Sequence, residues 1–301
     1  MFTRLAGGTI QSGEGGYIMK GCAIGAALVL VLGAGLLLAG CGATIGVTQE
    51  LVVDEPLGSA AVTDVEIDMG AGKLTLAPGA VGLVSGAVRY NVESWKPTIT
   101  RSDRSLTIKQ GAQKGLSGLG DKIVNEWNLE LGRAPMRLKI SAGAYEGAYD
   151  LSGLTLQRLN IRDGAARAQV FFNAANPGQM ESLEYETGAS TVTLIGLANA
   201  NFKNMKFKGG AGTYSLDFSG DLRTSGTVRA EAGAGTVRIV VPAATAARVT
   251  VSGSLNDVST EGQWTVDKGA YNTAAVATVG QGKVLTITVT VNVGSVALVT
   301  K

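Results

Sequence analysis

The sequence predicts an all-β protein built around a parallel β-solenoid of L-shaped rungs, 21–24 residues each, with a small β unit inserted near the N-terminus. Three observations predict this fold class. Apolar residues alternate with period two, the alternation repeatedly shifts by one position, and the shift recurs at a nearly constant spacing. After residue 41, no segment has the pattern of an α-helix of ten residues or more.

The shift in alternation indicates a corner within each rung. In LEYETGASTVTL, residues 183–194, apolar or small side chains stand at positions 183, 185 and 189 and then at 192 and 194. A strand that continued straight would place the second group on the opposite face of the sheet. A bend keeps both arms facing one core, and glycines beside the shift supply the backbone freedom that a bend needs.

These corners define the repeat. We place them at Ala71, Ala144, Ala165, Ala189, Ala211, Ala234, Leu255 and Val293. From Ala144 to Leu255, successive corners are 21, 24, 22, 23 and 21 residues apart, which is a solenoid period. Stacking in this register aligns outward charges of alternating sign three residues before each corner, at Arg162, Glu186, Lys208 and Glu231. We expect the C-terminal segment 284–300 to be the last rung.

The composition excludes several classes of function. The chain contains no His, which is the usual general base near neutral pH and the commonest metal ligand. The projected rungs bring no two carboxylates together, so we expect no catalysis, and no cofactor or metal site. The net charge is only +2 and acids and bases are interspersed, so the sequence does not show the clustered basic residues that nucleic-acid binding requires.

The N-terminal segment has the pattern of a targeting signal. Residues 22–38 are unbroken by charge, Lys20 precedes them, and Leu38-Ala39-Gly40-Cys41 follows. This pattern resembles a bacterial lipoprotein signal, which implies cleavage between Gly40 and Cys41 and lipidation of the Cys41 thiol. A retained transmembrane helix is the alternative, but the run is barely long enough to span a bilayer. Met19 starts the pattern better than Met1, so residues 1–18 are interpreted as a mis-assigned start, which the sequence does not decide.

The inserted unit supplies the strongest candidate for a ligand surface. Corners Ala71 and Ala144 are 73 residues apart, far more than one rung, and two of the three Trp residues fall in this gap. The candidate surface consists of Trp95, Lys96, Arg101, Arg104 and Trp127. The simpler interpretation is that both tryptophans are buried in a small core, because aromatic side chains dominate such cores.

Several stretches resemble the toast-rack family. They include MGAGKLTLAPGA, LVSGAVRYNVESWKPTI, EWNLELG, YDLSGLTLQRLNIRDGAA, FKGGAGTYSLDFSG and EAGAGTVRIVVP. The resemblance implies an envelope protein with a toast-rack domain followed by a β-solenoid similar to proposed adhesins and to cell-wall-active antibiotic response proteins. The expected domains are a signal at 1–40, a lipidated linker at 41–60, the toast-rack-type unit at 61–135 and the solenoid at 136–301. The stretches SAGAYEGAYDLSGL and RDGAARAQVFF lack the clean GAG motif found at corners Ala71, Ala211 and Ala234.

The expected function is that of an extracytoplasmic lipoprotein, tethered to a membrane, that acts as a non-catalytic interaction, adhesin-like or scaffold module of the cell envelope. The alternatives are an envelope-stress sensor and a glycan-binding lipoprotein. Expected partners are the membrane, through the lipid on Cys41, and another envelope protein, a cell-wall polymer or a second copy at a solenoid end. In a cell with two membranes, Gly42 after Cys41 favours the outer membrane or periplasm.

Overall fold

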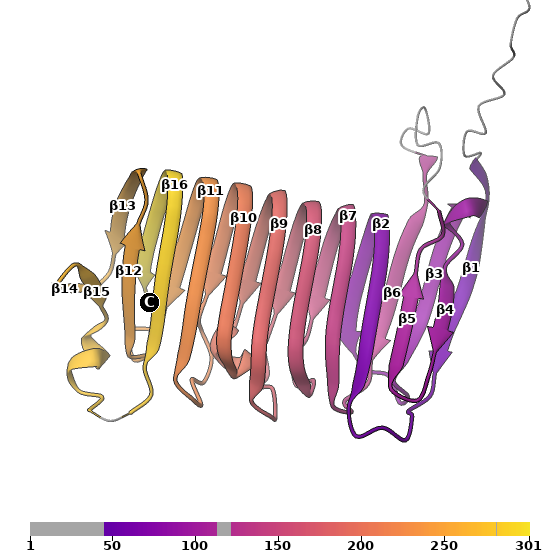
Figure 1. Ribbon diagram of the computed structural model, residues 1–301, viewed down its shortest axis with the longest axis horizontal. Helices are drawn as coiled ribbons and strands as arrows, with labels where there is room; N and C mark the ends of the chain where they lie inside the picture. Colours follow the sequence, from indigo (N-terminus) through magenta and orange to yellow (C-terminus); the bar gives the residue numbers. More distant parts are fainter. Residues whose placement is uncertain (1–44, 113–121, 281) are drawn as a thin grey trace, which may run out of the picture. The chain divides into compact units, whose positions relative to one another are not determined.

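A computed structural model describes residues 45–112, 122–280 and 282–301 (Figure 1). The predicted signal peptide, the cleavage site at Gly40 and the lipidation site at Cys41 lie outside the described residues. Residues Gly40–Lys301 belong to one compact unit. No helix in the described ranges is both long enough and apolar enough to cross a membrane.

The described chain is built almost entirely from β-strands. The strands are β1 (Ile45–Glu55), β2 (Thr63–Pro78), β3 (Val84–Val92), β4 (Thr98–Arg101), β5 (Ser105–Lys109), β6 (Asn125–Leu131), β7 (Met136–Asp150), β8 (Leu156–Phe171), β9 (Met180–Ile195), β10 (Phe202–Asp217), β11 (Gly226–Val241), β12 (Ala247–Ser252), β13 (Leu255–Glu261), β14 (Thr265–Asp267), β15 (Ala270–Asn272) and β16 (Leu285–Thr300). Three 3₁₀ turns accompany them: η1 (Glu93–Trp95), η3 (Leu197–Ala200) and η4 (Ala274–Ala277).

The long strands stack in parallel, and their register confirms the predicted corners. Ala71 aligns with Ala144, which aligns with Ala165. Further along, Ala189 aligns with Ala211, Ala211 with Ala234, Ala234 with Val293, and Val293 with Leu255. The charge ladder is also confirmed, because Arg162, Glu186, Lys208 and Glu231 follow one another across the strands.

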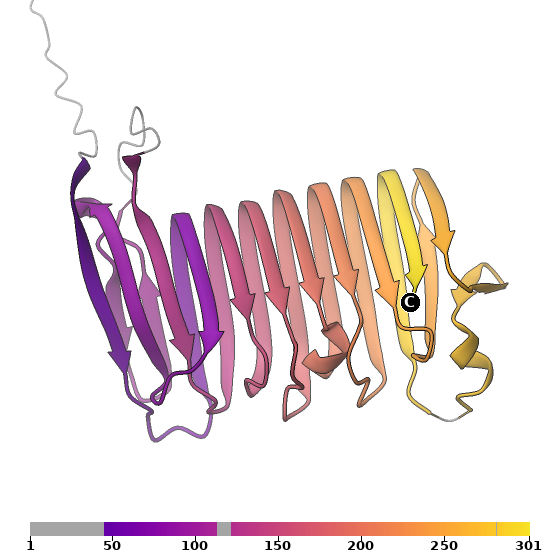
Figure 2. The ribbon, with the colours of Figure 1, turned by 180° about the vertical axis from the view of Figure 1, so that it is seen from behind.

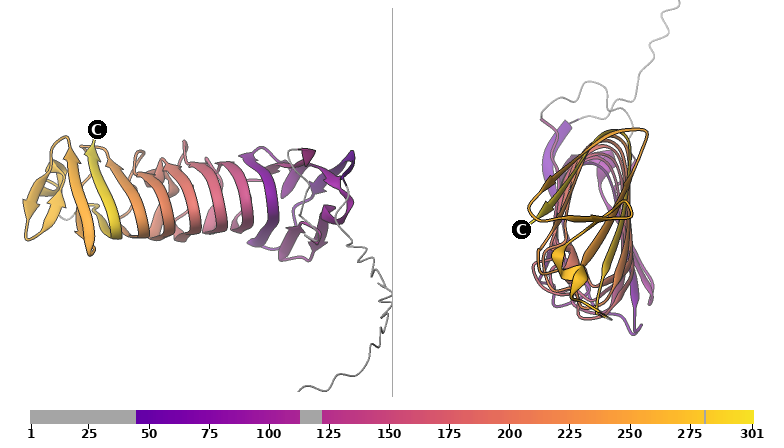
Figure 3. Two further views of the ribbon diagram at one scale, coloured as in Figure 1. Left: turned by 90° about the horizontal axis from the view of Figure 1, so that it is seen from above. Right: turned by 90° about the vertical axis from the view of Figure 1, so that its left-hand side faces the viewer.

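Each long strand folds over at its corner, so that one continuous strand supplies two arms. Figures 1 and 2 show the arms of each rung one behind the other, and the end-on view of Figure 3 shows the flattened ring they enclose. Side chains on both sides of each corner point into the ring. Val228, Val237 and Ile239 of β11 are all almost completely buried. Burial of such a two-sided core is the main stabilising contribution to the stack.

The tightest corners require glycine. Gly235 and Gly294 have φ angles of 122° and 142°, which side chains disfavour. A Cβ at Gly235 would overlap the carbonyl oxygen of Gly212 in the previous rung, and a Cβ at Gly294 would overlap that of Gly235. The GAG motif therefore serves two needs, a left-handed backbone and the close stacking of one corner on the next.

The inserted unit closes the N-terminal end of the stack. β5 continues the first arm of β2, through residue 68, and β6 continues its second arm, from residue 73. No described strand pairs with the corner between them on that side. Gln110 and Asn125 fill this gap: Gln110 Oε1 accepts hydrogen bonds from Gly70 N at 2.8 Å and Asn125 Nδ2 at 2.9 Å. β3 and then β1 extend the second-arm sheet, and β4 the first.

The sheet and the core continue across residue 135, where the sequence suggested a domain boundary. β2, from before that residue, pairs with β7, from after it, along both arms. One hydrophobic core includes Val53 near the N-terminal end and Leu298 near the C-terminus.

The C-terminal strand is not the last rung, and the prediction that it is was wrong. β16 lies between β11 on one side and β12 and β13 on the other. The chain builds the end rung from β12 and β13 first, passes through β14, β15 and η4, and then inserts β16 beneath that rung. β15 covers β12 on the first arm, whereas β13 pairs only with β16 among the described strands.

Candidate functional site

A polar cluster occupies the inside of the corner where β7, β8 and β9 meet. The inward position two residues before the corner is occupied by Met69, Ala142, Asp163, Thr187, Gly209, Ala232 and Val291 in successive rungs. Asp163 and Thr187 are the two polar residues in this row. Neither of their rungs has a GAG triplet at its corner, which is Gly164-Ala165-Ala166 in β8 and Gly188-Ala189-Ser190 in β9.

Four hydroxyl groups surround the Asp163 carboxylate. Tyr185 donates a hydrogen bond to Asp163 Oδ2 at 2.7 Å, and Tyr145 donates to the same oxygen at 3.3 Å. Thr187 donates to Oδ1, and Ser190 Oγ lies 3.5 Å from it. Ser190 also accepts a hydrogen bond from Ala166 N at 2.8 Å, so the cluster ties β8 to β9.

Tyr145 reaches this cluster because of a local gap. Tyr145 directly follows the corner residue Ala144. In β2, β10, β11 and β16 the residue directly after the corner is Gly. The inward position two residues later is Gly147, and a Cβ there would lie 2.7 Å from the Tyr145 ring. The missing side chain of Gly147 thus leaves room for the Tyr145 ring, which stacks with Tyr149 at 6.4 Å between centroids.

Burial dominates the electrostatics of the cluster. Desolvation raises the pKa of Asp163, and the hydrogen bonds from Thr187, Tyr185 and Tyr145 oppose this shift. Desolvation also raises the pKa of Tyr185 far above its usual value, and the neighbouring Tyr145 and Asp163 raise it further. The hydroxyls therefore stay protonated near neutral pH and act as donors. A single carboxylate held by hydroxyl donors from two neighbouring strands is suited to fixing the corner.

A cavity of about 420 Å³ lies next to this cluster, at the corners of β2 and β7. Trp95, Ile123, Asn125 and Tyr145 form part of its wall, and Lys73 and Glu146, which also line it, pair with each other at 3.7 Å from neighbouring strands. The Trp95 indole Nε1 is buried without a hydrogen-bond partner in the described structure. The cavity is mainly apolar, with charges of both signs on its wall.

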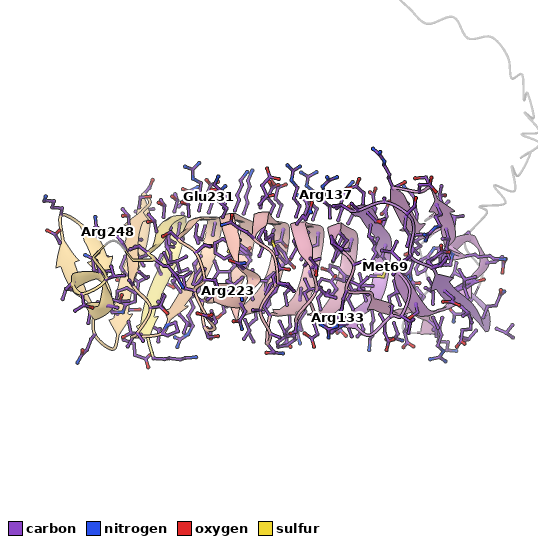
Figure 4. All side chains as sticks on the ribbon, turned by 90° about the horizontal axis from the view of Figure 1, so that it is seen from below. Met69, Arg133, Arg137, Arg223, Glu231 and Arg248 are labelled. Atoms are coloured by element: carbon purple, nitrogen blue, oxygen red, sulfur yellow. The ribbon has the colours of Figure 1, made fainter. Side chains whose placement is uncertain are left out.

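The outer face of the first arms carries most of the patterned charge, and we call it the charged face. It consists of Asp64, Glu66, Arg137, Lys139, Arg158, Asn160, Arg162, Glu184, Glu186, Lys206, Lys208, Arg229 and Glu231. Arg137 and Glu231 project on the same side in Figure 4. Glu186 lies between Arg162 at 3.5 Å and Lys206 at 3.7 Å. Lys208, Arg229 and Glu231 make no ion pair with any described residue.

The two predicted tryptophans are both buried, so their rings do not lie together on an exposed surface. Trp127 is fully buried in the main core, and its Nε1 donates to Asn125 Oδ1 at 2.9 Å. Trp95 is 1% exposed and packs with Val92 and Ile123 in a separate small cluster. Burial of both rings follows from their size, since apolar area removed from water is the largest stabilising contribution available to this unit.

The three predicted basic residues lie directly after η1, at the end of β4 and in the turn between β4 and β5. Lys96 is exposed directly after η1. Arg101, on β4, pairs with Glu55 at 3.2 Å and is only 25% exposed, so this ion pair ties β4 to β1. Arg104 is exposed and lines a different cavity with Asp64 and Arg137. The structure therefore does not bring Lys96, Arg101 and Arg104 together with the tryptophans as one site.

Within the described ranges, no group of three or more His, Cys, Asp or Glu side chains could hold a metal ion. The Asp163 cluster was missed at the level of the sequence. The available signal was an Asp at an inward position of a rung, aligned with a Thr in the next rung and followed by Ser190 at the corner.

Comparison with protein families gives one match. Residues 44–195 match the family described as "N-terminal domain of toast_rack, DUF2154". The chain belongs to the toast-rack family. In this toast-rack protein the match ends at the last residue of β9, whereas β10, β11 and β16 continue the same stack in the same register. No curated protein matches the chain.

Several solved structures are similar to this toast-rack protein. A proposed cell adhesion protein from Clostridium sporogenes is 20% identical, with a TM-score of 0.45 over 85% of this chain and 99% of its own. A proposed adhesin from Parabacteroides merdae is 11% identical, with a TM-score of 0.39 over 85% and 97%. A proposed lipid-binding protein from Parabacteroides distasonis is 10% identical, with a TM-score of 0.30 over 86% and 98%. At these values we draw nothing about function from the similarity.

Proposed function

We propose that this toast-rack protein is a lipid-anchored, extracytoplasmic protein that acts as a non-catalytic interaction module of the cell envelope, adhesin-like or scaffolding. The observation that carries the proposal is the charged face. Its side chains project from rungs fixed in register, so their charges form a rigid two-dimensional pattern. Such a pattern favours a partner whose surface charges are complementary.

The unpaired part of that face is the best candidate for the contact. Lys208 and Glu231 are in register on β10 and β11, and Arg229 lies one outward position before Glu231. These three side chains give up no ion pair within the described structure when a partner binds. By contrast, Arg137 and Lys139 already pair with Asp64 at 3.0 Å and Glu66 at 2.7 Å.

The lipid anchor is supported by the sequence at residues 20–41. An apolar run behind Lys20 ends in Leu38-Ala39-Gly40-Cys41. Cleavage before Cys41 would remove Cys22 and leave Cys41 as the single thiol of the mature chain. A diacylglyceryl group anchors a protein far more firmly than a single acyl chain does.

Charge reversal tests the proposed contact. Arg229→Glu is compared with Arg167→Glu, which reverses an exposed Arg on the outer face of the second arm. Partners cross-linked to the wild-type protein in intact cells are identified by mass spectrometry. We expect Arg229→Glu to lose a specific partner and Arg167→Glu to retain it. Equal recovery of every partner by both variants would reject the charged face as the contact.

A second candidate function is glycan binding, which the cavity beside Trp95 favours because its wall combines aromatic and charged side chains. Chitin-derived N-acetylglucosamine oligomers provide the probe. Binding would shift the Trp95 indole resonance in an ¹⁵N NMR spectrum and leave that of Trp264, at the other end of the stack, unchanged. An unchanged Trp95 resonance at saturating sugar would reject it. The role of an envelope-stress sensor stays a prediction from the sequence.

A further inference from the structure

We propose that the start of β1 contacts the lipid bilayer, so that the N-terminal end of the stack faces the membrane and the rung of β12 and β13 points away from it. This inference rests on the proposed lipid anchor at Cys41. It adds an orientation, and an interaction surface for lipid, that the anchor alone does not define.

The length of chain before β1 limits where the bilayer can lie. β1 begins at Ile45, four residues after Cys41. An extended chain advances at most about 3.3–3.6 Å per residue, so Ile45 lies within about 14 Å of the anchored residue. The headgroup layer of one leaflet is about 5–8 Å thick. The first residues of β1 are therefore held at the membrane surface whenever Cys41 is lipidated.

The side chains at this point are apolar and uncovered. Val47 is 82% exposed and Ile45 is 38% exposed. Pairing with β3 brackets this part of the strand, since Ile45 aligns with Val92 and Gln49 with Tyr90, and the register shifts between these two pairs. Gln49 is held further by hydrogen bonds with Tyr90 and Glu93. Val47 lies in the irregular stretch between these two pairs, and a bilayer interface would remove its exposed side chain from water.

The charges of this end do not require an anionic lipid. The exposed charged groups on β1, on its neighbours and around η1 and β4 carry both signs: Arg89, Lys96, Arg104, Lys109, Lys122, Glu50, Asp54, Glu93 and Asp103. Arg89 and Lys109 already pair with Glu126 and Asp68, so neither sign of charge prevails at this end and no strong attraction to an anionic surface is expected. The contact is driven by the lipid anchor and the apolar side chains, and we expect it equally on zwitterionic membranes.

If the N-terminal end of the stack faces the bilayer, the opposite end lies too far from the bilayer to contact it. The second-arm sheet runs from β1 through β3, β6, β2, β7, β8, β9, β10, β11 and β16 to β13. Ten steps of about 4.8 Å between neighbouring strands separate its edges by about 48 Å. Leu255, at the corner of the far rung, is 72% exposed and so reports on the position of that end.

Depth-dependent quenching tests the orientation. The mature chain has no free thiol when Cys41 is lipidated, so Val47→Cys, Val52→Cys and Leu255→Cys each introduce one labelling site. Val52 is the matched control, because it lies on the same strand and is 68% exposed. Each full-length lipidated variant carries an environment-sensitive fluorophore in phosphatidylcholine vesicles that contain a headgroup-level spin-labelled lipid.

We expect loss of fluorescence at position 47, a smaller loss at 52 and none at 255, unchanged when phosphatidylglycerol is added. Flotation of the vesicles on a density gradient is measured first. Variants that float but show equal quenching at 47 and 255, or no quenching at 47, would overturn the orientation and leave the anchor intact. Failure of every variant to float would overturn the anchor, and the orientation with it.

Discussion

The Tyr185 hydroxyl donates a 2.7 Å hydrogen bond to Asp163 Oδ2 from the neighbouring rung, inside a corner that is apolar in most other rungs. This contact makes Asp163 a buried carboxylate supported by hydroxyl groups. Its pKa is raised above the ordinary value of 3.8, with desolvation as the main cause. The raised pKa has a direct consequence for stability.

Asp163→Asn is expected to change how stability depends on pH. Because the folded-state pKa is raised, the folded state binds the Asp163 proton more tightly than the unfolded state does. The contribution of Asp163 to the free energy of unfolding therefore rises as the pH falls from above its raised pKa toward 3.8. Urea denaturation at pH 7 and near pH 4.5 measures it, and acidification should favour the wild type relative to the variant. Parallel pH dependences in the two proteins would contradict this.

Tyr185→Phe isolates one donor of the cluster. The variant removes a hydrogen bond to a buried carboxylate, which should cost about 1–3 kcal/mol of unfolding free energy. Tyr214→Phe is the matched control, because both rings are fully buried but the Tyr214 hydroxyl makes only a 3.5 Å contact with Gly188 O. Urea denaturation should rank Tyr185→Phe as clearly less stable than Tyr214→Phe. The reverse ranking would show that the carboxylate does not depend on Tyr185.

Gly235→Ala tests the glycine corner. Its φ of 122° disfavours a side chain, and the added Cβ would meet the Gly212 carbonyl oxygen. We expect a loss of more than about 1–3 kcal/mol, since the strained backbone and the overlap add. Gly178→Ala is the control, because nothing lies within 4 Å of its added Cβ, and its effect should stay within about 0.5 kcal/mol. Similar melting temperatures for the two variants would reject the stacked-corner explanation.

The corners and charge ladders were predictable because the alternation of inward and outward residues along each strand can be followed in the sequence. A period of two that shifts at Ala189 and again at Ala211 allows only a bend or a reversal of faces, and a regular spacing favours the bend. The stacking register then follows, because only in-register rungs align Arg162 with Glu186 and bury both arms.

The remaining features depend on contacts in three dimensions that the spacing of apolar residues along the sequence does not reveal. The order of rungs in space differs from their order in the chain, so the position of β16 beneath β12 and β13 could not be seen in its pattern. Trp127 was included in a candidate ligand surface, beside the simpler interpretation of a buried core, because a sequence does not show which face of an irregular unit is covered. Asp163 was missed because an isolated polar residue in an apolar row gains its meaning only beside Tyr185 and Thr187.

Two side-chain substitutions test the burial of β16 in the stack. Ile287 of β16 is fully buried, and Ile287→Ala should cost about 2–5 kcal/mol, as expected for a core position between two rungs. Leu255→Ala, in the end rung at a side chain that is 72% exposed, should change stability by no more than about 0.5 kcal/mol. Thermal melting of both variants gives the comparison. A mild effect of Ile287→Ala would contradict the burial of β16 in the core.

The central claim is that Cys41 carries a lipid that holds the stack at a membrane, and the mass of the N-terminal peptide tests it most directly. The protein is purified from bacterial membranes, digested, and its first peptide measured by mass spectrometry. We predict a peptide that begins at Cys41 and carries a diacylglyceryl group on its thiol. A peptide that extends unbroken through residues 40 and 41, with an unmodified thiol, would contradict the claim.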